Sequence, residues 1–259
     1  MRAAIKRLIW GTALHRLIRR LRSARQPRDL NHRYDAETIE VMRRVLRADS
    51  NAVDVGAHEG TVLIEMTDLA PRGQHHAFEA LPHLAAKLRT LFPRAQIHQV
   101  AVADQPGQAE FQFVENAPAY SGLRQRIYDR SDPVITSIPV TVTTLDRTLP
   151  ADLPIAFLKI DIEGGEYHAL RGAIETLRRW HPVIVFEAGP NSTGQYGVSP
   201  DQIFDFLVNE LGYELTTMQR WLTGQAPYTR DEYRQNWEQG PDYYFLAAPG
   251  SAAIPSNTT

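Results

Sequence analysis

The sequence predicts an α/β protein with a mostly parallel sheet, helices on both faces of that sheet and an antiparallel hairpin at one edge. Strand-like apolar runs alternate with amphipathic helical segments from residue 51 to residue 186, which is the pattern of a parallel sheet covered on both faces. Two of these runs, 51–55 and 155–160, end in carboxylates and glycine. The last two strand-like segments are joined by a long polar loop without a clear helical pattern, which favours an antiparallel pair.

The spacing of apolar residues in each segment predicts whether it forms a helix or a strand. Helices are expected at 35–47 with Asp35 as the N-cap, and at 61–69, 82–92, 167–180 and 200–211. Strands are expected at 51–55, 74–79, 96–103, 110–114, 138–143, 155–160, 183–186, 213–217 and 243–247. Between the fourth and fifth of these strands lies a polar loop, 115–137, whose length is typical of functional loops.

Charge divides the chain into three parts: a basic amphipathic extension (1–34), the main domain (35–248) and a small polar tail (249–259) that we expect to be flexible. Nine lysines and arginines precede the first acid, Asp29. This extension could lie on an anionic membrane surface, or it could pack its apolar face on the domain, which we favour. It lacks a signal-peptide cleavage pattern, and no apolar run approaches the roughly 20 residues of a membrane span.

Composition excludes several classes of chemistry. The 259 residues include no cysteine, so disulfides, a thiol nucleophile and cysteine-ligated zinc are ruled out. The net charge of -2 and the lack of a basic stripe in the late chain predict no nucleic-acid partner. We expect a cytoplasmic protein that either stays free or touches the membrane through its basic extension.

The first acidic strand end, Asp54 to Gly60, has the form of a ligand-binding loop. Gly56 permits a tight turn, and the following helix offers free backbone amides. The spacing D-x-G-x-x-x-G differs from the dinucleotide fingerprint, and a carboxylate at its start suits a cationic amino group better than a pyrophosphate. Glu79 ends the next strand, where an acid can accept hydrogen bonds from ribose hydroxyls. S-adenosylmethionine fits this combination; the alternative is that Asp54 only caps the helix.

The second acidic strand end, Lys159 to Glu166, has the form of a reaction centre. Asp161 and Glu163 follow a buried strand, where carboxylates need a partner. Lys159 can pair with one of them from the same strand face. Such carboxylates can bind Mg²⁺, act as a general base toward a hydroxyl, or form a structural ion pair, and the sequence leaves metal and base open.

The motifs together resemble a known family. In order, they are Asp-Val-Gly-Ala-His-Glu-Gly from residue 54, Phe-Glu-Ala from 78, Val-Ala-Val from 100, Thr-Thr-Leu-Asp from 143, Leu-Lys-Ile-Asp-Ile-Glu-Gly-Gly-Glu from 158 and Pro-Val-Ile-Val-Phe-Glu from 182. This run is similar to the FkbM family of S-adenosylmethionine-dependent methyltransferases. The resemblance covers residues 51–187.

The resemblance implies a class I methyltransferase fold, Rossmann-like, with a seven-stranded sheet. It implies O-methylation of a small-molecule or glycan hydroxyl, on a sugar, polysaccharide or polyketide. The implied cofactor-binding residues are Asp54, Gly56, His58 and Gly60 for the methionine part, Glu79 for the ribose, Ala101 and Val102 beside the adenine, and Asp161 beside the sulfonium.

A hydroxyl acceptor needs help to lose its proton. The candidate catalytic residues are Asp161 first, then Glu163, Glu187 and His168, while Asp161 and Glu163 are also the candidate Mg²⁺ ligands. Four aromatic residues of the late loop form either a lid over the site or part of the packing: Trp221, Tyr228, Tyr233 and Trp237.

Three rival functions remain for comparison. A nicotinamide dehydrogenase is disfavoured by the missing third glycine and by the acid that opens the first loop. A binding or scaffolding protein of the same fold is disfavoured by the intact acids at positions 54, 79 and 161. A methyltransferase for a non-carbohydrate acceptor, such as a protein or an amine, is the third.

Overall fold

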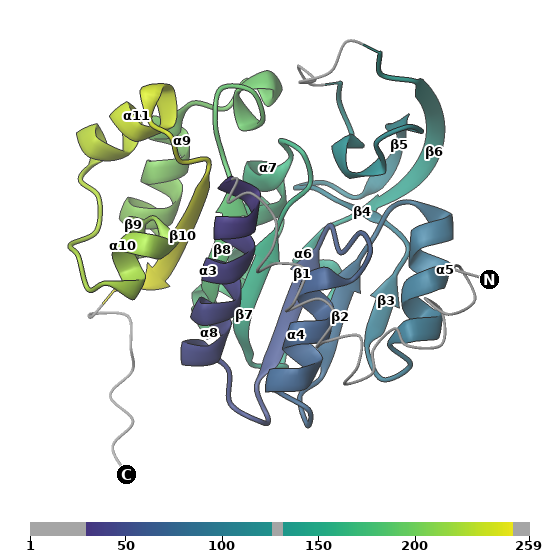
Figure 1. The fold of residues 1–259 in the computed structure, drawn as a ribbon, viewed down its shortest axis with the longest axis horizontal. Helices are drawn as coiled ribbons and strands as arrows, with labels where there is room; N and C mark the ends of the chain where they lie inside the picture. The colour runs from purple at the N-terminus through teal and green to yellow at the C-terminus, as the bar shows by residue number, and fades with distance from the viewer. Residues whose placement is uncertain (1–29, 126–131, 251–259) are drawn as a thin grey trace.

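The structure, a computed structural model, describes residues 30–125 and 132–250. Most of the basic extension and nearly all of the polar tail therefore lie outside the described residues. The main feature is a seven-stranded sheet in the order β3-β2-β1-β7-β8-β10-β9 (Figure 1). Every strand pair from β3 to β8 is parallel, whereas β10 runs antiparallel to both β8 and β9. The predicted parallel sheet with an antiparallel hairpin is confirmed.

The strands of this sheet are short and buried at its centre. They are β1 (Asn51–Val55), β2 (His75–Phe78), β3 (Gln96–His98), β7 (Ile155–Ile160), β8 (Val183–Glu187), β9 (Tyr213–Thr216) and β10 (Tyr244–Pro249). All residues of β1 and β8 are buried. Two-sided burial of this kind explains why both strands read as continuous apolar runs in the sequence.

Helices cover both faces of the sheet. They are α3 (Leu30–Val45), α4 (Thr61–Leu69), α5 (Pro82–Leu91), α6 (Leu145–Thr148), α7 (Glu166–Arg171), α8 (Ile174–Trp180), α9 (Pro200–Phe204) with its π-helical continuation η3 (Asp205–Glu210), α10 (Met218–Leu222) and α11 (Arg230–Gln239). One apolar core lies between the sheet and the helices α3, α4 and α10, which cover the sheet face turned to the viewer in Figure 1. A second apolar core lies between the other face of the sheet and the helices α7, α8 and α9.

A smaller three-stranded sheet, β4-β6-β5, stands beside the main one and is formed by β4 (Ala101–Val102), β5 (Gly107–Val114) and β6 (Ile135–Thr143) (Figure 1). The single strand predicted at 96–103 is therefore wrong, because its first part pairs with β2 and its second part pairs with β6. Periodicity cannot show such a change of partner, since both parts are extended.

Three helix predictions also need correction. The helix predicted to begin after Asp35 is α3, which begins at Leu30. Asp35 therefore lies within the helix and does not cap it. The helix predicted at 167–180 is two helices separated at Gly172, where an added Cβ would lie 2.2 Å from the carbonyl oxygen of Ala103. The late loop predicted to lack helices contains α10 and α11.

The Thr-Leu-Asp segment has a structural role. The Thr144 side chain caps α6, while both oxygens of Asp146 accept hydrogen bonds from the backbone amides of Glu175 and Thr176 at the start of α8. These contacts tie the small sheet's last strand to the helix layer.

Among the helices within residues 30–125 and 132–250, none has the length and apolar character needed to cross a membrane.

Candidate active site

Two cavities meet at the carboxyl ends of β1 and β7. The first, about 160 Å³, is lined by Gly56, Glu79, Ala101, Val102, Phe111, Leu123, Tyr196 and others. The second, about 700 Å³, extends from the same place toward α3, β8 and α11. His58, Asp161 and Glu163 line both cavities. Ligands bind at the carboxyl ends of strands in open α/β sheets, so this junction is the candidate site.

The loop after β1 closely approaches the loop after β7. Gly56 has φ +85°, and an added Cβ would lie 1.9 Å from the carbonyl oxygen of Asp161. Only glycine meets both requirements without strain. His58 and Glu163 also have positive φ, at 47° and 61°, although neither is glycine. Non-glycine residues in this region are uncommon and concentrate at functional sites.

Asp54 lies beneath this junction with 1 % of its surface exposed. Burial raises the pKa of Asp54 to about 6, although the nearby ammonium of Lys159 opposes the shift. Its Oδ2 atom is buried and makes no hydrogen bond within the described residues, and Asp54 is one of the residues that line the second cavity. A buried carboxylate oxygen without a partner is costly, and a cationic ligand would satisfy it.

Glu79 is held rigidly at the end of β2. Its two oxygens accept hydrogen bonds from the backbone amides of His58, at 2.8 Å, and Leu81, at 2.9 Å. Burial raises the pKa of Glu79, and these two hydrogen bonds oppose the rise. Each carboxylate oxygen keeps a second lone pair, so Glu79 can still accept hydrogen bonds from a diol.

The remaining wall of the first cavity is apolar and comes from elements far apart in the sequence. Ala101 and Val102, predicted to flank an adenine, line it, and so do Phe111 of β5, Leu123 and Tyr196. The Tyr196 hydroxyl accepts a hydrogen bond from the backbone amide of Arg124 at 3.1 Å. Sequence reasoning missed Phe111 and Tyr196, because no local motif marks them and they reach the cavity only through the small sheet and the loop after β8.

Asp161 is held at the junction by two side chains. Its Oδ2 atom lies 2.7 Å from Lys159 Nζ and accepts a hydrogen bond from the Tyr244 hydroxyl at 2.5 Å. Burial lowers the pKa of Lys159, but the carboxylates of Asp161 and Asp54 outweigh this effect and hold the pKa above its usual value. The predicted pairing of Lys159 with a carboxylate two residues away is confirmed. Tyr244, which arrives from the antiparallel β10, was missed.

Glu163 and Glu187 converge on Asp161. One ligand oxygen from each of the three carboxylates lies within 4.8 Å of the others, a spacing that can hold a cation. Two donors already occupy Asp161 Oδ2, which leaves fewer electron pairs for a metal ion. The Mg²⁺ site at Asp161 and Glu163 stays a prediction.

Glu166, just beyond these acids, fixes the shape of the loop that carries them. Its Oε1 atom accepts hydrogen bonds from the backbone amides of Ile162, at 2.9 Å, and Gly164, at 3.1 Å. Burial raises the pKa of Glu166 to about 7, and the backbone hydrogen bonds oppose the shift. Glu166 therefore positions the loop and does not itself line either cavity.

Two predicted site residues lie outside both cavities. His168 points away on α7, with its Nδ1 atom 3.3 Å from Asp104 Oδ2. Gly60 packs against α5, where an added Cβ would lie 2.6 Å from Phe92. Gly60 thus supports the turn between β1 and α4 without lining the cavity, and we leave His168 out of the site.

The four late aromatic residues have different roles. Tyr233 is fully buried and packs edge-on against Phe245 at 5.0 Å, while Trp221 and Tyr228 pack against the two apolar cores. Trp237 lines the second cavity from α11, and its Nε1 atom is buried without a hydrogen-bond partner in the described residues. Packing therefore accounts for three of them, and only Trp237 reaches the cavity.

A match to a family model shows the family to which the chain belongs. The family model described as the methyltransferase FkbM domain matches residues 54–215, more than half of the chain. The chain belongs to the FkbM methyltransferase family. It accordingly has the class I, S-adenosylmethionine-dependent methyltransferase architecture, as the strand order and the antiparallel final hairpin also show. No curated protein matches the chain.

Three solved structures to which the chain is similar are described as methyltransferases, each at low sequence identity. The methyltransferase FkbM from Methylobacillus flagellatus KT is 16 % identical with a TM-score of 0.49, and the match covers 92 % of this chain but only 60 % of that one. An O-methyltransferase from Bacillus cereus in complex with SAH is 13 % identical with a TM-score of 0.45 and coverages of 95 % and 97 %. Precorrin-6y C5,15-methyltransferase from Geobacter metallireducens GS-15 is 17 % identical with a TM-score of 0.43 and coverages of 85 % and 89 %.

Proposed function

We propose that this FkbM-family protein is an S-adenosylmethionine-dependent O-methyltransferase that acts on the hydroxyl of a small molecule or glycan. The observation that carries the proposal is the position of Asp161, a carboxylate on the wall shared by a small, partly apolar cavity and a large polar one. In this proposal the first cavity would hold the nucleoside part of the donor, and the second would hold the acceptor. A base at their junction is the group that a hydroxyl acceptor requires.

The residues around the junction of the two cavities fit the family's methyl donor. Asp54 Oδ2, buried and lacking a hydrogen bond among the described residues, would hold the amino group, while Glu79 would accept hydrogen bonds from the ribose hydroxyls. Gly56 keeps the backbone open beside them, and Ala101 and Val102 would flank the adenine.

Chemically, the donor supplies a methyl group on a sulfonium: an oxygen–carbon bond forms as the sulfur–carbon bond breaks, and a neutral thioether remains. The protein's contribution is to hold the acceptor oxygen in line and to take its proton. We assign the proton-accepting role to Asp161. Lys159 and Tyr244 hold its Oδ2 atom in place, and Glu163 and Glu187 stand near enough to take part in binding the acceptor.

Calorimetric titration with S-adenosylhomocysteine tests the cofactor site. The wild type should bind in the micromolar range. Glu79→Ala should weaken binding at least about tenfold, because both ribose hydrogen bonds are lost. Ala119→Trp provides a second variant, since Ala119 is exposed and lines both cavities, so its replacement blocks the site without disturbing the core.

Binding by a folded wild type that neither variant weakens would contradict the placement of the cofactor. No binding at all by a folded wild type would contradict the proposed function and favour a non-catalytic binding protein of the same fold.

A further inference from the structure

The two cavities differ in the kinds of side chain that line them. Several valine, leucine, isoleucine and phenylalanine side chains line the first cavity, whereas Val62 is the only side chain of these four types among the described residues that line the second. Tyrosine, tryptophan and hydrogen-bonding side chains form most of the second wall instead. A cavity for a lipid or a hydrocarbon chain needs apolar walls, so this wall favours a ligand that carries many hydroxyl groups.

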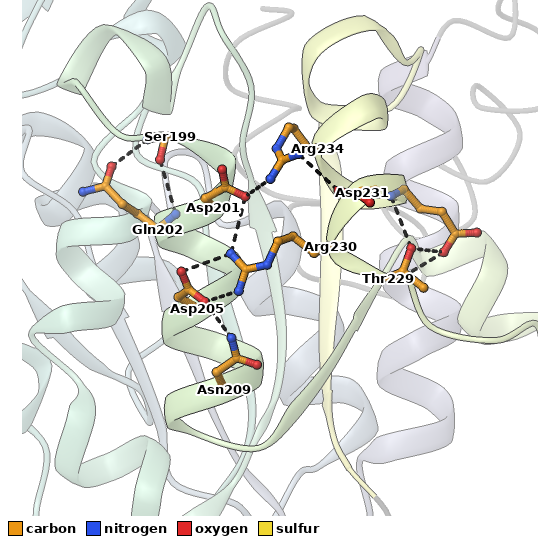
Figure 2. A network of polar contacts seen from close by, with 10 residues as sticks. Ser199, Asp201, Gln202, Asp205, Asn209, Thr229, Arg230, Asp231 and Arg234 are labelled. Atoms are coloured by element: carbon orange, nitrogen blue, oxygen red, sulfur yellow. Dashed lines mark hydrogen bonds and ion pairs between the residues drawn. The ribbon is translucent and has the colours of Figure 1, made fainter.

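Trp237 reaches the second cavity from a helix whose position is fixed. Tyr233 lies one turn earlier on the same face of α11, is fully buried and packs edge-on against Phe245. Two arginines of α11 also join it to α9 through ion pairs (Figure 2). The indole ring therefore has a defined place before a ligand binds, which lowers the entropic cost of binding.

The loop after β8 supports the six-membered ring of this indole. An added Cβ on Gly194 would lie 3.3 Å from Cη2 of Trp237 and 3.6 Å from Cζ2, so the ring packs where Gly194 has no side chain. Residues 188–192, just before Gly194, line the same cavity. Trp237 itself keeps part of its surface exposed. The ring is thus supported by this loop and still accessible to a ligand.

The nitrogen of the same indole lacks a partner. Nε1 of Trp237 is buried and has no hydrogen-bond partner within residues 30–125 and 132–250. An indole N–H can only donate a hydrogen bond, and a buried donor that is left unpaired costs free energy. The group that would complete this site is an oxygen with a free lone pair, such as a hydroxyl or ring oxygen of a ligand.

We propose that Trp237 is a specificity-determining residue that selects a carbohydrate acceptor. A sugar ring lies against the indole, and Nε1 donates a hydrogen bond to an oxygen of the same glycan. Sugar rings carry C–H groups on their faces and hydroxyls at their edges, which match an aromatic face within a polar wall. The N–H bond lies in the plane of the indole, so the oxygen belongs to the edge of that sugar or to the next unit.

This inference rests on the proposed function and names the class of its acceptor. Asp161 lines both cavities, whereas Trp237 lines only the second. The glycan therefore extends from the junction, where its hydroxyl meets the methyl donor, to α11. An apolar acceptor is disfavoured because the second wall offers it little aliphatic surface.

Calorimetric titration of the protein loaded with S-adenosylhomocysteine tests the class of acceptor. The ligands are cellobiose, maltose, mannobiose and N,N′-diacetylchitobiose, compared with hexanediol and catechol, which carry hydroxyls without a sugar ring. We expect at least one disaccharide to bind at least about tenfold more tightly than hexanediol or catechol. Failure of all the disaccharides to bind, or equal or tighter binding of hexanediol or catechol, would overturn the inference.

Variants of Trp237 separate the ring from its nitrogen. Trp237→Phe keeps an aromatic face and loses the N–H, so the affinity for the best disaccharide should fall about threefold to tenfold. Trp237→Ala loses both groups and should weaken binding further, while both variants keep the wild-type affinity for S-adenosylhomocysteine. Thermal melting checks that each variant folds, and Trp237→Phe decides the question if the alanine variant does not. Unchanged disaccharide affinity in a folded Trp237→Phe would contradict the assignment.

Trp221→Phe is the matched control. Trp221 packs against the apolar core on the α3 side of the sheet and lines neither cavity, so its replacement should leave disaccharide affinity unchanged. Tryptophan fluorescence gives a second measurement. The disaccharide should change the emission of the wild type and of Trp221→Phe but not that of Trp237→Phe. A change that persists in Trp237→Phe and disappears in Trp221→Phe would place the sugar elsewhere and overturn the inference.

The two proposals fail in different ways. Failure of a folded wild type to bind S-adenosylhomocysteine would contradict the proposed function. The disaccharide titrations would then be repeated on the unloaded protein, where the Trp237 variants have the same two outcomes. Normal binding of S-adenosylhomocysteine without binding of any disaccharide would overturn only the assignment of Trp237.

Discussion

The ammonium of Lys159 in β7 lies 2.7 Å from Oδ2 of Asp161, the first residue after that strand. Side chains two residues apart on a strand share a face, so this contact is local in sequence. Its environment is not local, because Asp54 arrives from β1 and Tyr244 from β10. The pair is the centre of a buried charge cluster at the proposed reaction site.

Replacing Lys159 with methionine should destabilise the protein by about 3 to 5 kcal/mol, since the remaining buried carboxylates lose their shared cation. Chemical denaturation measures this loss. The double variant Lys159→Met with Asp161→Asn should recover part of the stability, because one of the uncompensated charges is also removed. A double variant no more stable than Lys159→Met alone would show that the ion pair is not the cause.

Gly56→Ala should abolish cofactor binding and strongly lower stability. The added methyl group would lie 1.9 Å from the Asp161 carbonyl oxygen, and φ is +85° at this position. Gly224→Ala is the matched control, because Gly224 has a similar φ of +71° but nothing within 4 Å of its added Cβ. The control should lose only roughly 1 kcal/mol, which is the conformational cost of the left-handed backbone. Equal melting temperatures for the two variants would contradict the close approach of the two loops.

Binding of S-adenosylhomocysteine should weaken in acid because of Asp54. Burial raises the pKa of Asp54 to about 6, so this carboxylate is ionised above that pH and protonated below it. Only the ionised form attracts the ligand's amino group. Affinity should therefore be highest above about pH 6 and fall by up to about tenfold per pH unit below it. The Asp54→Asn variant should bind S-adenosylhomocysteine weakly at every pH and show no loss of affinity in acid. If that variant loses affinity in acid as the wild type does, another group causes the pH dependence.

The ion pairs between α11 and α9 should control acceptor binding through the position of Trp237. Figure 2 shows Arg230 reaching Asp201 and Asp205 while Arg234 reaches Asp201. Arg230→Ala with Arg234→Ala should raise the KM for the acceptor severalfold and leave global stability nearly unchanged, because exposed ion pairs contribute little to folding. Steady-state kinetics measure the KM for the acceptor, and thermal melting measures the stability.

Arg178→Ala is the control for this prediction. Arg178 of α8 pairs with Glu210 of η3 at 3.1 Å and lines neither cavity. Its removal should leave KM unchanged. A rise in KM as large as that of the α11 double variant would mean that helix charge in general, and not the position of Trp237, determines acceptor binding.

Some misses could have been avoided from the sequence. Thr229 and Glu232 form a capping box at the start of α11, a pattern visible in the sequence, but α11 has too few apolar residues to show helical periodicity. Gly172 separates α7 from α8 and could have been taken as a break in the predicted helix. The division of 96–103 between two sheets had no local signal.

The sequence by itself determined the alternation of strands and helices, the antiparallel hairpin and the two acidic loops, because burial on a sheet and the turn chemistry of glycine leave direct marks on neighbouring residues. Only the tertiary structure decided which side chains meet. Tyr244, Glu187 and Trp237 reach the second cavity from β10, β8 and α11, and His168 does not. Such meetings depend on strand order and helix orientation, which are set by the packing of the whole domain and not by any local pattern.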